Sequence, residues 1–303
     1  MALQSSGAIK ISEIKAELGS SSNSLRTLSA AAGFSTPDAM SEFYGYSNAP
    51  VNTHYYSNDG VNDYIKGPWE NYTSLNSIDW SISFWVKQNQ TTKATQHYFD
   101  FNGNSTLNSG NTNYRLFLQY NASLNRFILR LRTNAVNFDR QWSLHDNSSV
   151  TGVSNSGTGW VASQRGNTNA AGWTLLTMTY DASQTSSTNA FKIYWNGNEL
   201  TSQAAANSGT RSASTLGSLC LGAAQHNVTA GLANVFIDEF AFYSDILTSA
   251  EATALYNSGT IVSPDTINTN NLQEVVQFGA SNSLNTYGGL YGGVISGGST
   301  IAY

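Results

Sequence analysis

The chain has 303 residues, of which 12% are aromatic and only 11% are charged, and its formal net charge is −5. The absence of a Lys/Arg cluster argues against nucleic acid as a partner, and no apolar run reaches the ~18 residues of a membrane span. The single cysteine, Cys220, excludes an internal disulfide. Residues 1–10 lack the basic and apolar regions of a signal peptide, which predicts synthesis and folding in a cytoplasm.

The first 47 residues contain three short helical patterns with capping residues. We predict helices over 12–18, 25–32 and 37–44, the last beginning at a Thr-Pro-Asp signal. So small a segment buries little core alone, so we expect it to pack on the following domain or on another protein. The residues expected to make this attachment are Ile9, Ile14, Leu18, Met40, Phe43 and Tyr44.

Strand patterns follow a predicted linker at residues 46–50. In residues 81–87, Ile82, Phe84 and Val86 alternate with Ser83, Trp85 and Lys87, which is the pattern of a strand with two distinct faces. Further strands are predicted over 55–66, 114–120, 127–132, 173–180, 191–195, 216–221 and 235–243. Asn196-Gly197 predicts a hairpin turn, and the spacing of all these strands predicts an all-β, antiparallel two-sheet sandwich.

The last part of the sequence changes character twice. Thr248 and Glu251 form a capping box, which predicts a helix through Tyr256 that ends near Gly259. After Pro264 the periodicity is lost, and the glycines at 288–293 predict a tail that is flexible or ordered only against a partner. The predicted organisation is a helical segment at 1–47, a sandwich at 48–262 and a Gly-rich extension at 263–303.

Four segments in order carry a family resemblance. They are DGVNDYI at 59–65, WSISFWVK at 80–87, GWTLLTMTYD at 172–181 with FKIYWNG at 191–197, and IDEFAFY at 237–243 with ILTSAE at 246–251. In this order they resemble the laminin-G-like, or concanavalin A-like, jelly-roll superfamily. The resemblance implies a jelly-roll sandwich that acts as a binding or structural module.

The N-terminal segment carries a second resemblance. SGAIKISEI at 6–14 and MSEFYG at 40–45 are similar to the short leader of virion proteins of tailed bacteriophages, including those of marine cyanobacteria. Such leaders precede variable domains that are often glycan-binding. The resemblance implies a virion location, other virion proteins as partners, a homo-oligomer, and adhesion to host-surface glycans.

Carboxylates decide whether hydrolysis of a polysaccharide is expected. Glycoside hydrolysis needs two carboxylates ~5–10 Å apart, which on a strand means positions i and i+2 or i+4. The nearest candidate is Asp238-Glu239, an adjacent pair whose side chains should diverge, and structural or calcium roles suit it better. We therefore predict that the protein is not an enzyme.

Two kinds of ligand site remain. The family resemblance implies calcium, the one candidate cofactor, on loops at one end of the sandwich, where Asp59, Asn62, Asp63, Asp181 and Asp238 are the matching or loop-adjacent residues. Asp59 and Asp63 could instead be turn residues and Asp238 a cap of buried amides. For glycan stacking the candidates in or near predicted loops are Trp142, Trp160 and Tyr120, although loop anchoring or subunit contact also fits them.

Three functional hypotheses follow. The first is a phage virion structural protein of the capsid or tail whose sandwich helps host-surface adhesion. The second is a free carbohydrate-binding lectin. The third is a polysaccharide-degrading tail enzyme, which the missing carboxylate pair disfavours.

Overall fold

The computed structural model divides into two compact units, residues 1–51 and residues 52–303. The boundary lies at residue 51 and not at residue 47. The structure describes residues 3–4, 7–18, 20–32, 34, 36–44, 46, 55–61, 63–73, 75–88, 95–102, 114–134, 136–144, 173–211, 215–224, 231–259, 261–279, 283–287, 294–296 and 300–302. In this part of the chain no helix is long and apolar enough to cross a membrane.

The N-terminal unit contains the helices α1 (Ile11–Leu18), α2 (Leu25–Ala31) and η1 (Met40–Phe43). The predicted cap of α2 is confirmed, because the Ser24 side chain accepts a hydrogen bond from the Thr27 N–H at 3.4 Å. The third predicted helix, 37–44, is wrong in extent. It is a single 3₁₀ turn whose first amide, that of Ala39, is satisfied by the Glu42 carboxylate at 3.0 Å.

This unit has its own small core. Ile14, Leu28 and Phe43 have no exposed surface. The predicted attachment residues Ile9, Leu18 and Met40 pack against them, so most of that set is used inside the unit. Ile14 and Phe43 in particular offer nothing to a partner, which corrects the expectation for them. Tyr44, which is 43% exposed, is the member of the set that remains accessible.

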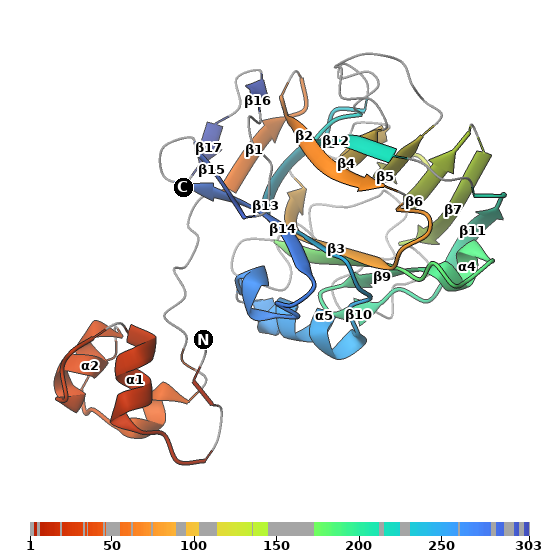
Figure 1. The fold of residues 1–303 in the computed structure, drawn as a ribbon. Coiled ribbons are helices and arrows are strands. Elements are labelled where there is room, and N and C mark those ends of the chain that lie inside the picture. Colours follow the sequence, from red (N-terminus) through yellow and green to blue (C-terminus); the bar gives the residue numbers. More distant parts are fainter. Residues whose placement is uncertain are drawn as a thin grey trace. The chain divides into compact units, whose positions relative to one another are not determined.

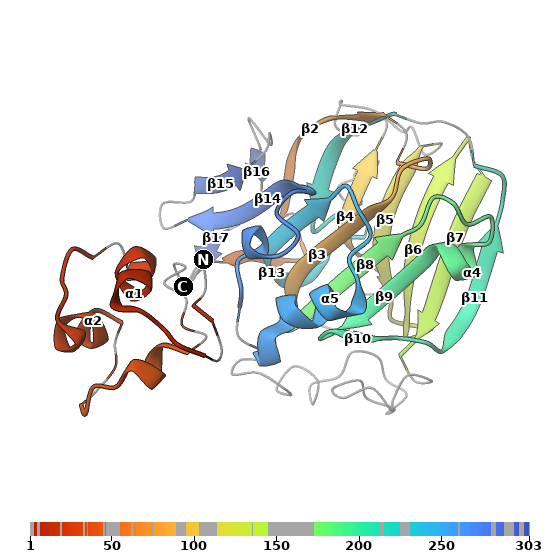
Figure 2. The ribbon, with the colours of Figure 1, turned by 60° about the horizontal axis from the view of Figure 1, so that its bottom comes forward.

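The second unit is a sandwich of two antiparallel sheets (Figure 1) (Figure 2). In order, sheet A contains β10 (Asn198–Glu199), β9 (Phe191–Trp195), β8 (Thr174–Tyr180), β3 (Trp80–Gln88), β13 (Asn234–Tyr243), β1 (Tyr55–Asp59) and β17 (Thr300–Ala302), and it also includes β14 (Leu272–Gly279) and β15 (Ser283–Tyr287). In order, sheet B contains β11 (Gln203–Ser208), β7 (Val136–Ser143), β6 (Arg126–Thr133), β5 (Arg115–Asn121), β4 (Thr95–Asn102), β12 (Thr215–Leu221), β2 (Tyr64–Thr73) and β16 (Val294–Ser296). The predicted all-β sandwich class is confirmed.

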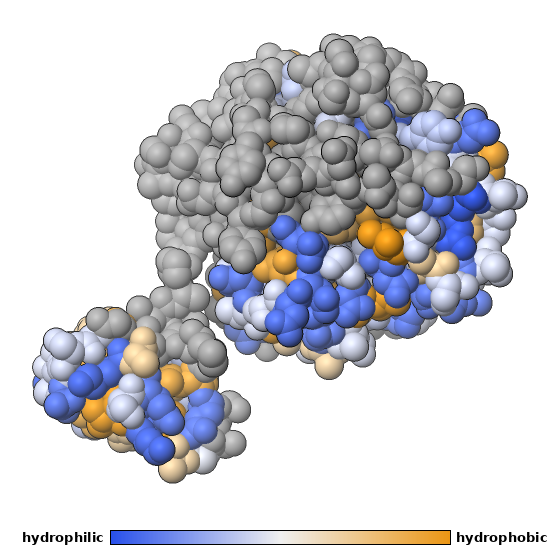
Figure 3. Space-filling model, viewed as in Figure 1, coloured by the Kyte–Doolittle hydropathy of each residue, from blue (hydrophilic) through white to orange (hydrophobic). Residues whose placement is uncertain are grey.

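Period-two burial builds the core between the sheets. Ile82, Phe84 and Val86 of β3 face inward and are buried, as their alternation predicts. The opposite face of β3 is also covered, because Trp85 belongs to a second apolar cluster that includes Leu255. Both faces of the middle of sheet A are therefore packed. Around them, the described surface visible in Figure 3 is mostly hydrophilic, with small hydrophobic patches.

The helix α5 (Ser249–Tyr256) supplies much of this second cover. Its predicted capping box is present: Thr248 Oγ1 accepts from the Glu251 N–H at 3.2 Å, and the Glu251 carboxylate accepts from the Thr248 N–H at 2.7 Å. Figure 2 shows α5 lying against sheet A. The remaining short helices of this unit are α4 (Ser187–Ala190), η2 (Asn257–Gly259) and η3 (Pro264–Thr266).

The predicted separate extension at 263–303 is wrong for its described residues. Strand β14 pairs with β13 and buries Leu272, Val275 and Val276. Strand β16 pairs with β2 in sheet B, and β17 pairs with β1 in sheet A. These strands are parts of the sandwich because each supplies hydrogen-bond partners to an edge that would otherwise be open. Residues 288–293 lie outside the described part of the chain.

Candidate functional site

The predicted glycan-stacking residues do not present aromatic faces. Trp142 lies in β7 and Tyr120 in β5, both on the inner face, and neither has any exposed surface. Both lie near the end of their strand, as expected, but each fills the space between the sheets and has no face to offer a glycan. Trp160 lies outside the described residues.

The predicted calcium residues are only partly brought together. Asp59 and Asp63 share the β1–β2 connection, where the Asp63 carboxylate accepts a hydrogen bond from the Asp59 N–H at 3.0 Å. Asp238 is separate, because Asp59 pairs with Asn234, four positions before it on β13. Asn62 is not among the described residues, and those that are described contain no cluster of three or more His, Cys, Asp or Glu side chains.

The adjacent acids Asp238 and Glu239 lie at a β-bulge in the middle of β13. The register with β3 shifts between Asp238 and Ala241, and Glu239 has φ of +48°, a left-handed conformation that costs energy for a residue other than glycine. Both acids are 2% exposed. Burial, together with the neighbouring Glu239, raises the pKa of Asp238 well above its usual range. Their burial withholds both from a polysaccharide, so they do not form the pair of a hydrolase.

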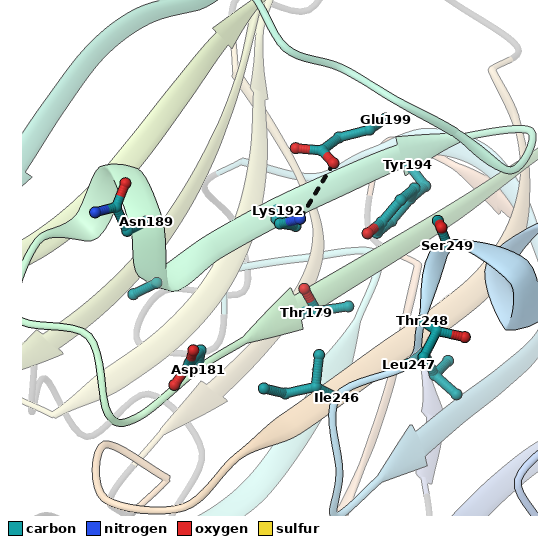
Figure 4. Close-up of a pocket in the computed structure, with 11 residues that line it drawn as sticks. Thr179, Asp181, Asn189, Lys192, Tyr194, Glu199, Ile246, Leu247, Thr248 and Ser249 are labelled. Carbon is teal, nitrogen blue, oxygen red and sulfur yellow. Dashed lines mark hydrogen bonds and ion pairs between the residues drawn. The ribbon is translucent and has the colours of Figure 1, made fainter.

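The described residues form a different site, a pocket of about 310 Å³ on the outer face of sheet A. Alternation along β9 turns Phe191, Ile193 and Trp195 into the core and leaves Lys192 and Tyr194 on the outer face. Figure 4 shows how strands β8–β10 and the segment before α5 contribute to it. The lining residues are Thr179, Asp181, Asn189, Ala190, Lys192, Tyr194, Glu199, Ile246, Leu247, Thr248 and Ser249.

Strand register explains why these side chains converge. Thr179 lies opposite Lys192 across β8 and β9, and the Asn196-Gly197 turn brings Glu199 opposite Tyr194. Lys192 Nζ and Glu199 Oε2 form an ion pair at 3.3 Å, drawn as the dashed line in Figure 4. The pocket therefore has one floor of strand side chains and one wall from the segment that enters α5.

The surroundings of Asp181 and Tyr194 set the protonation states of these two residues of the pocket. Hydrogen bonds from Ser183 are the largest cause of the lowered pKa of Asp181, which also accepts from Gln184 at 3.0 Å. Asp181 is therefore ionised at neutral pH. Burial raises the pKa of Tyr194, so its phenol keeps its proton. The pocket thus offers a cation, carboxylate acceptors and hydroxyl groups within one small volume.

The capping box occupies two amides at the N-terminal end of α5, those of Thr248 and Glu251. The pocket offers a ligand the side chains that line it. Their chemistry suits a neutral, hydroxyl-rich molecule that both donates and accepts hydrogen bonds.

The sequence contained a partial signal for this pocket. The alternation in FKIYW places Lys192 and Tyr194 on one face, and the Asn-Gly turn places Glu199 beside them. No local pattern indicates that residues 246–249 lie over the same strands, because that contact joins segments far apart in the sequence. The sequence therefore predicts β8, β9, the hairpin turn and α5, but neither α4, which contributes Asn189 and Ala190, nor the pocket itself.

Comparison with known proteins gives a family match. The family model Laminin_G_3, described as the concanavalin A-like lectin/glucanases superfamily, matches residues 59–253. No curated protein matches the sequence.

Solved structures with a similar fold include a pentraxin and a neurotoxin domain. A heptameric SAP-like pentraxin from Limulus polyphemus is 11% identical, with 82% of this chain and 96% of that chain covered and a TM-score of 0.43. The Botulinum neurotoxin serotype D ligand binding domain in complex with N-acetylneuraminic acid is 16% identical, with 69% and 43% covered and a TM-score of 0.44. The match thus spans less than half of the neurotoxin chain. At these identities and TM-scores, neither likeness bears on function.

Proposed function

The chain belongs to the concanavalin A-like lectin/glucanases superfamily, and from this premise we propose that its sandwich binds carbohydrate. The proposed site is the pocket formed by β8, β9, β10 and the segment before α5. A lectin function agrees with the family and requires no reactive group.

The pocket's size and lining are the observation that supports this proposal. Its volume of about 310 Å³ is at the lower end of the range for small-molecule sites. Sugar hydroxyls both donate and accept hydrogen bonds, and here Lys192 donates, Glu199 and Asp181 accept, and Asn189 does both. Tyr194, which is 3% exposed, lies in the floor of the pocket and presents no open ring face for stacking.

Glycan-array binding by the full chain tests the proposal. We expect Asn189→Ala and Lys192→Ala each to weaken binding of the best glycan by roughly tenfold, about the net value of a hydrogen bond to a charged group. Asn207→Ala is the matched control, because Asn207 is an exposed asparagine of β11 in the other sheet. Equal binding by all variants would place the glycan elsewhere, and no binding by the wild type would refute the lectin proposal.

Binding is favoured over hydrolysis for a specific reason. The acid catalyst of a glycoside hydrolase needs a raised pKa, whereas that of Asp181 is lowered. Glu199, the other acid of the pocket, is paired with Lys192. We therefore expect no release of reducing ends when the pure protein is incubated with a polysaccharide that it binds. A measurable release would instead establish the degrading activity.

We also propose that the chain is a virion structural protein of a tailed phage, held as a homo-oligomer among other virion proteins. The supporting observation is that the N-terminal unit folds around its own core, as expected for an attachment module carried ahead of a binding domain. Mass spectrometry of the proteins in purified phage particles tests this proposal. If this chain is absent from intact particles, the proposal is refuted. Light scattering on the pure chain measures the oligomeric state.

Calcium binding by Asp59 and Asp63 remains a proposal. Asp63 is 2% exposed, and its Oδ1 is buried with no hydrogen-bond partner among the described residues, so this carboxylate oxygen is one that a cation would satisfy. We expect millimolar calcium to raise the melting temperature of the wild type and not that of Asp63→Asn. An equal rise in both proteins would assign calcium to another place, and no rise in either would remove it as a cofactor.

A further inference from the structure

Three arginines lie on the outer face of sheet B, on neighbouring strands. Arg115 of β5 lies directly opposite Arg132 of β6, and Arg130 lies one residue pair further along β6 on the same face. The residues between them, Leu116 and Leu131, face the core, which confirms the outward direction. In a chain of net charge −5, this concentration of positive charge on one face needs an explanation.

Two of these arginines have carboxylate partners. Arg115 forms a two-point ion pair with the buried Asp100, with Nε to Oδ1 at 3.2 Å. Arg130 pairs with Asp139 of β7 at 3.1 Å. Both guanidinium groups also lie over the ring of Phe117, at 4.5 and 5.7 Å from its centre. Arg115 and Arg130 are therefore fixed in place.

Arg132 differs from the other two arginines, because no acidic side chain among the described residues pairs with it. Its Nε is buried without a hydrogen-bond acceptor, and no ion pair joins it to any described residue. Its pKa is lowered, chiefly by burial and further by repulsion from Arg115 and Arg130. Like charges directly opposite each other on neighbouring strands are destabilising. An anion bound beside Arg132 would therefore offset this repulsion.

The next residue across the sheet also lacks a partner. Asn137 of β7 pairs with Arg132 in the register, and its Oδ1 is buried without a hydrogen-bond donor. The two unpaired atoms themselves have no exposed surface, whereas the side chains of Arg132 and Asn137 are only half-buried and the neighbouring Val136 is 40% exposed. A ligand therefore meets the remaining N–H groups of the guanidinium and of the Asn137 amide, and it must supply an anionic acceptor.

We propose that Arg132 and Asn137 form a second binding site, for the anionic group of an acidic polysaccharide. A carboxylate or a sulfate ester would accept from the Arg132 guanidinium and from the Asn137 Nδ2–H. The polysaccharide class rests on the proposed carbohydrate binding. The site itself is separate from the pocket, because it lies on the other sheet.

Binding measurements on the full chain test this site. The probes are oligogalacturonate for the carboxylate, dextran sulfate for the sulfate ester, and dextran as the uncharged comparison, all at 150 mM NaCl. We expect the wild type to bind at least one acidic probe, and Arg132→Gln to weaken that binding tenfold or more. Which acidic probe binds identifies the anionic group.

Arg126→Gln is the matched control. Arg126 is on the same strand and face, six residues and so ~20 Å from Arg132, and its cross-strand neighbours are Asn121 and Ser143 instead of an arginine. We expect this variant to bind within twofold of the wild type. Equal weakening by both substitutions would mean general charge attraction and would overturn the proposal, as would the absence of binding to either acidic probe.

Two further readouts separate this inference from a structural role and from the pocket. Arg132→Gln should keep or raise the melting temperature, because it removes repulsion; a clear fall would make Arg132 a structural residue and overturn the site. Acidic-probe binding that is lost in Lys192→Ala and kept in Arg132→Gln would also overturn it, while supporting the pocket. Failure of the lectin proposal appears separately, as unchanged glycan-array binding in Asn189→Ala and Lys192→Ala.

Discussion

Trp142 shows how one residue's position changes the expected effect of its substitution. It is fully buried between the sheets, and the guanidinium of Arg140 lies 5.0 Å from the centre of its ring. Trp142→Ala should lower the free energy of unfolding by about 3–5 kcal/mol, because a large cavity opens in the core. Urea denaturation followed by circular dichroism measures this. Trp142→Phe should cost less, and an unchanged unfolding midpoint in Trp142→Ala would contradict the core position.

Asp238 should make stability depend on pH. Burial raises the pKa of Asp238 in the folded protein above its value in the unfolded chain. The free energy of unfolding therefore falls as the pH rises through the folded pKa, because the buried carboxyl then becomes charged. Asp238→Asn removes this loss. We expect its gain in melting temperature over the wild type to be small at pH 4 and larger at pH 8.

The pH-matched control is Asp245→Asn, which changes the same chemical group on a half-buried residue outside the strand. A gain for Asp238→Asn that is the same at both pH values would contradict the assigned cause.

At the scale of single residues, the sequence pattern fails to indicate a strand where a charged residue faces the core. In β7 the inner face is Phe138, Arg140 and Trp142, and the arginine interrupts the apolar alternation by which strands are recognised. Arg140 is accommodated because its guanidinium donates to the carbonyl of Phe191 and lies over Trp142. The sequence pattern does not indicate such a contact, and for this reason it predicts no strand over 136–143.

At the scale of elements, the β9–β10 hairpin and α5 depend on one glycine. Gly197 has φ of +77°, and a Cβ there would lie 2.8 Å from Thr253 Cα. Gly197→Ala should therefore destabilise the protein by about 1–3 kcal/mol, through backbone strain and through displacement of α5. Thermal unfolding measures this. Asn198→Ala, at the next and exposed position, should stay within about 0.5 kcal/mol of the wild type.

Strands with a row of apolar residues on the inner face were the predictable elements. β3, β8, β9 and β13 lie within a residue or two of their predicted ranges because each has an apolar inner face. β14 gave no such signal. Val275 and Val276 are adjacent and both buried, since one packs in the cluster under α5 and the other in the main core. The other apolar residues of β14 are separated from these valines by Gln273, Glu274 and Gln277, so no alternation marks the strand.

At the scale of the whole molecule, the sandwich depends on residues beyond the predicted boundary at 262. A chain ending there loses β14 and its three buried aliphatic side chains, Leu272, Val275 and Val276. At roughly 2 kcal/mol each, the loss is roughly 5 kcal/mol or more. We expect the shortened chain to unfold at a much lower urea concentration than the full chain, or to be unfolded.

Val276→Ala in the full chain removes only part of one of these side chains. It should lower the free energy of unfolding by less than the truncation does. Equal stability of the shortened and full chains would show that β14 is dispensable.

The pairing of β16 with β2 and of β17 with β1 sets an order of events during synthesis. β1 and β2 leave the ribosome early, whereas the strands that cover their outer edges, residues 294–296 and 300–302, leave more than 200 residues later. A nascent chain therefore carries two open strand edges through most of translation. These edges are the places at which neighbouring nascent chains would associate, and chaperone capture before release would protect the yield of folded protein.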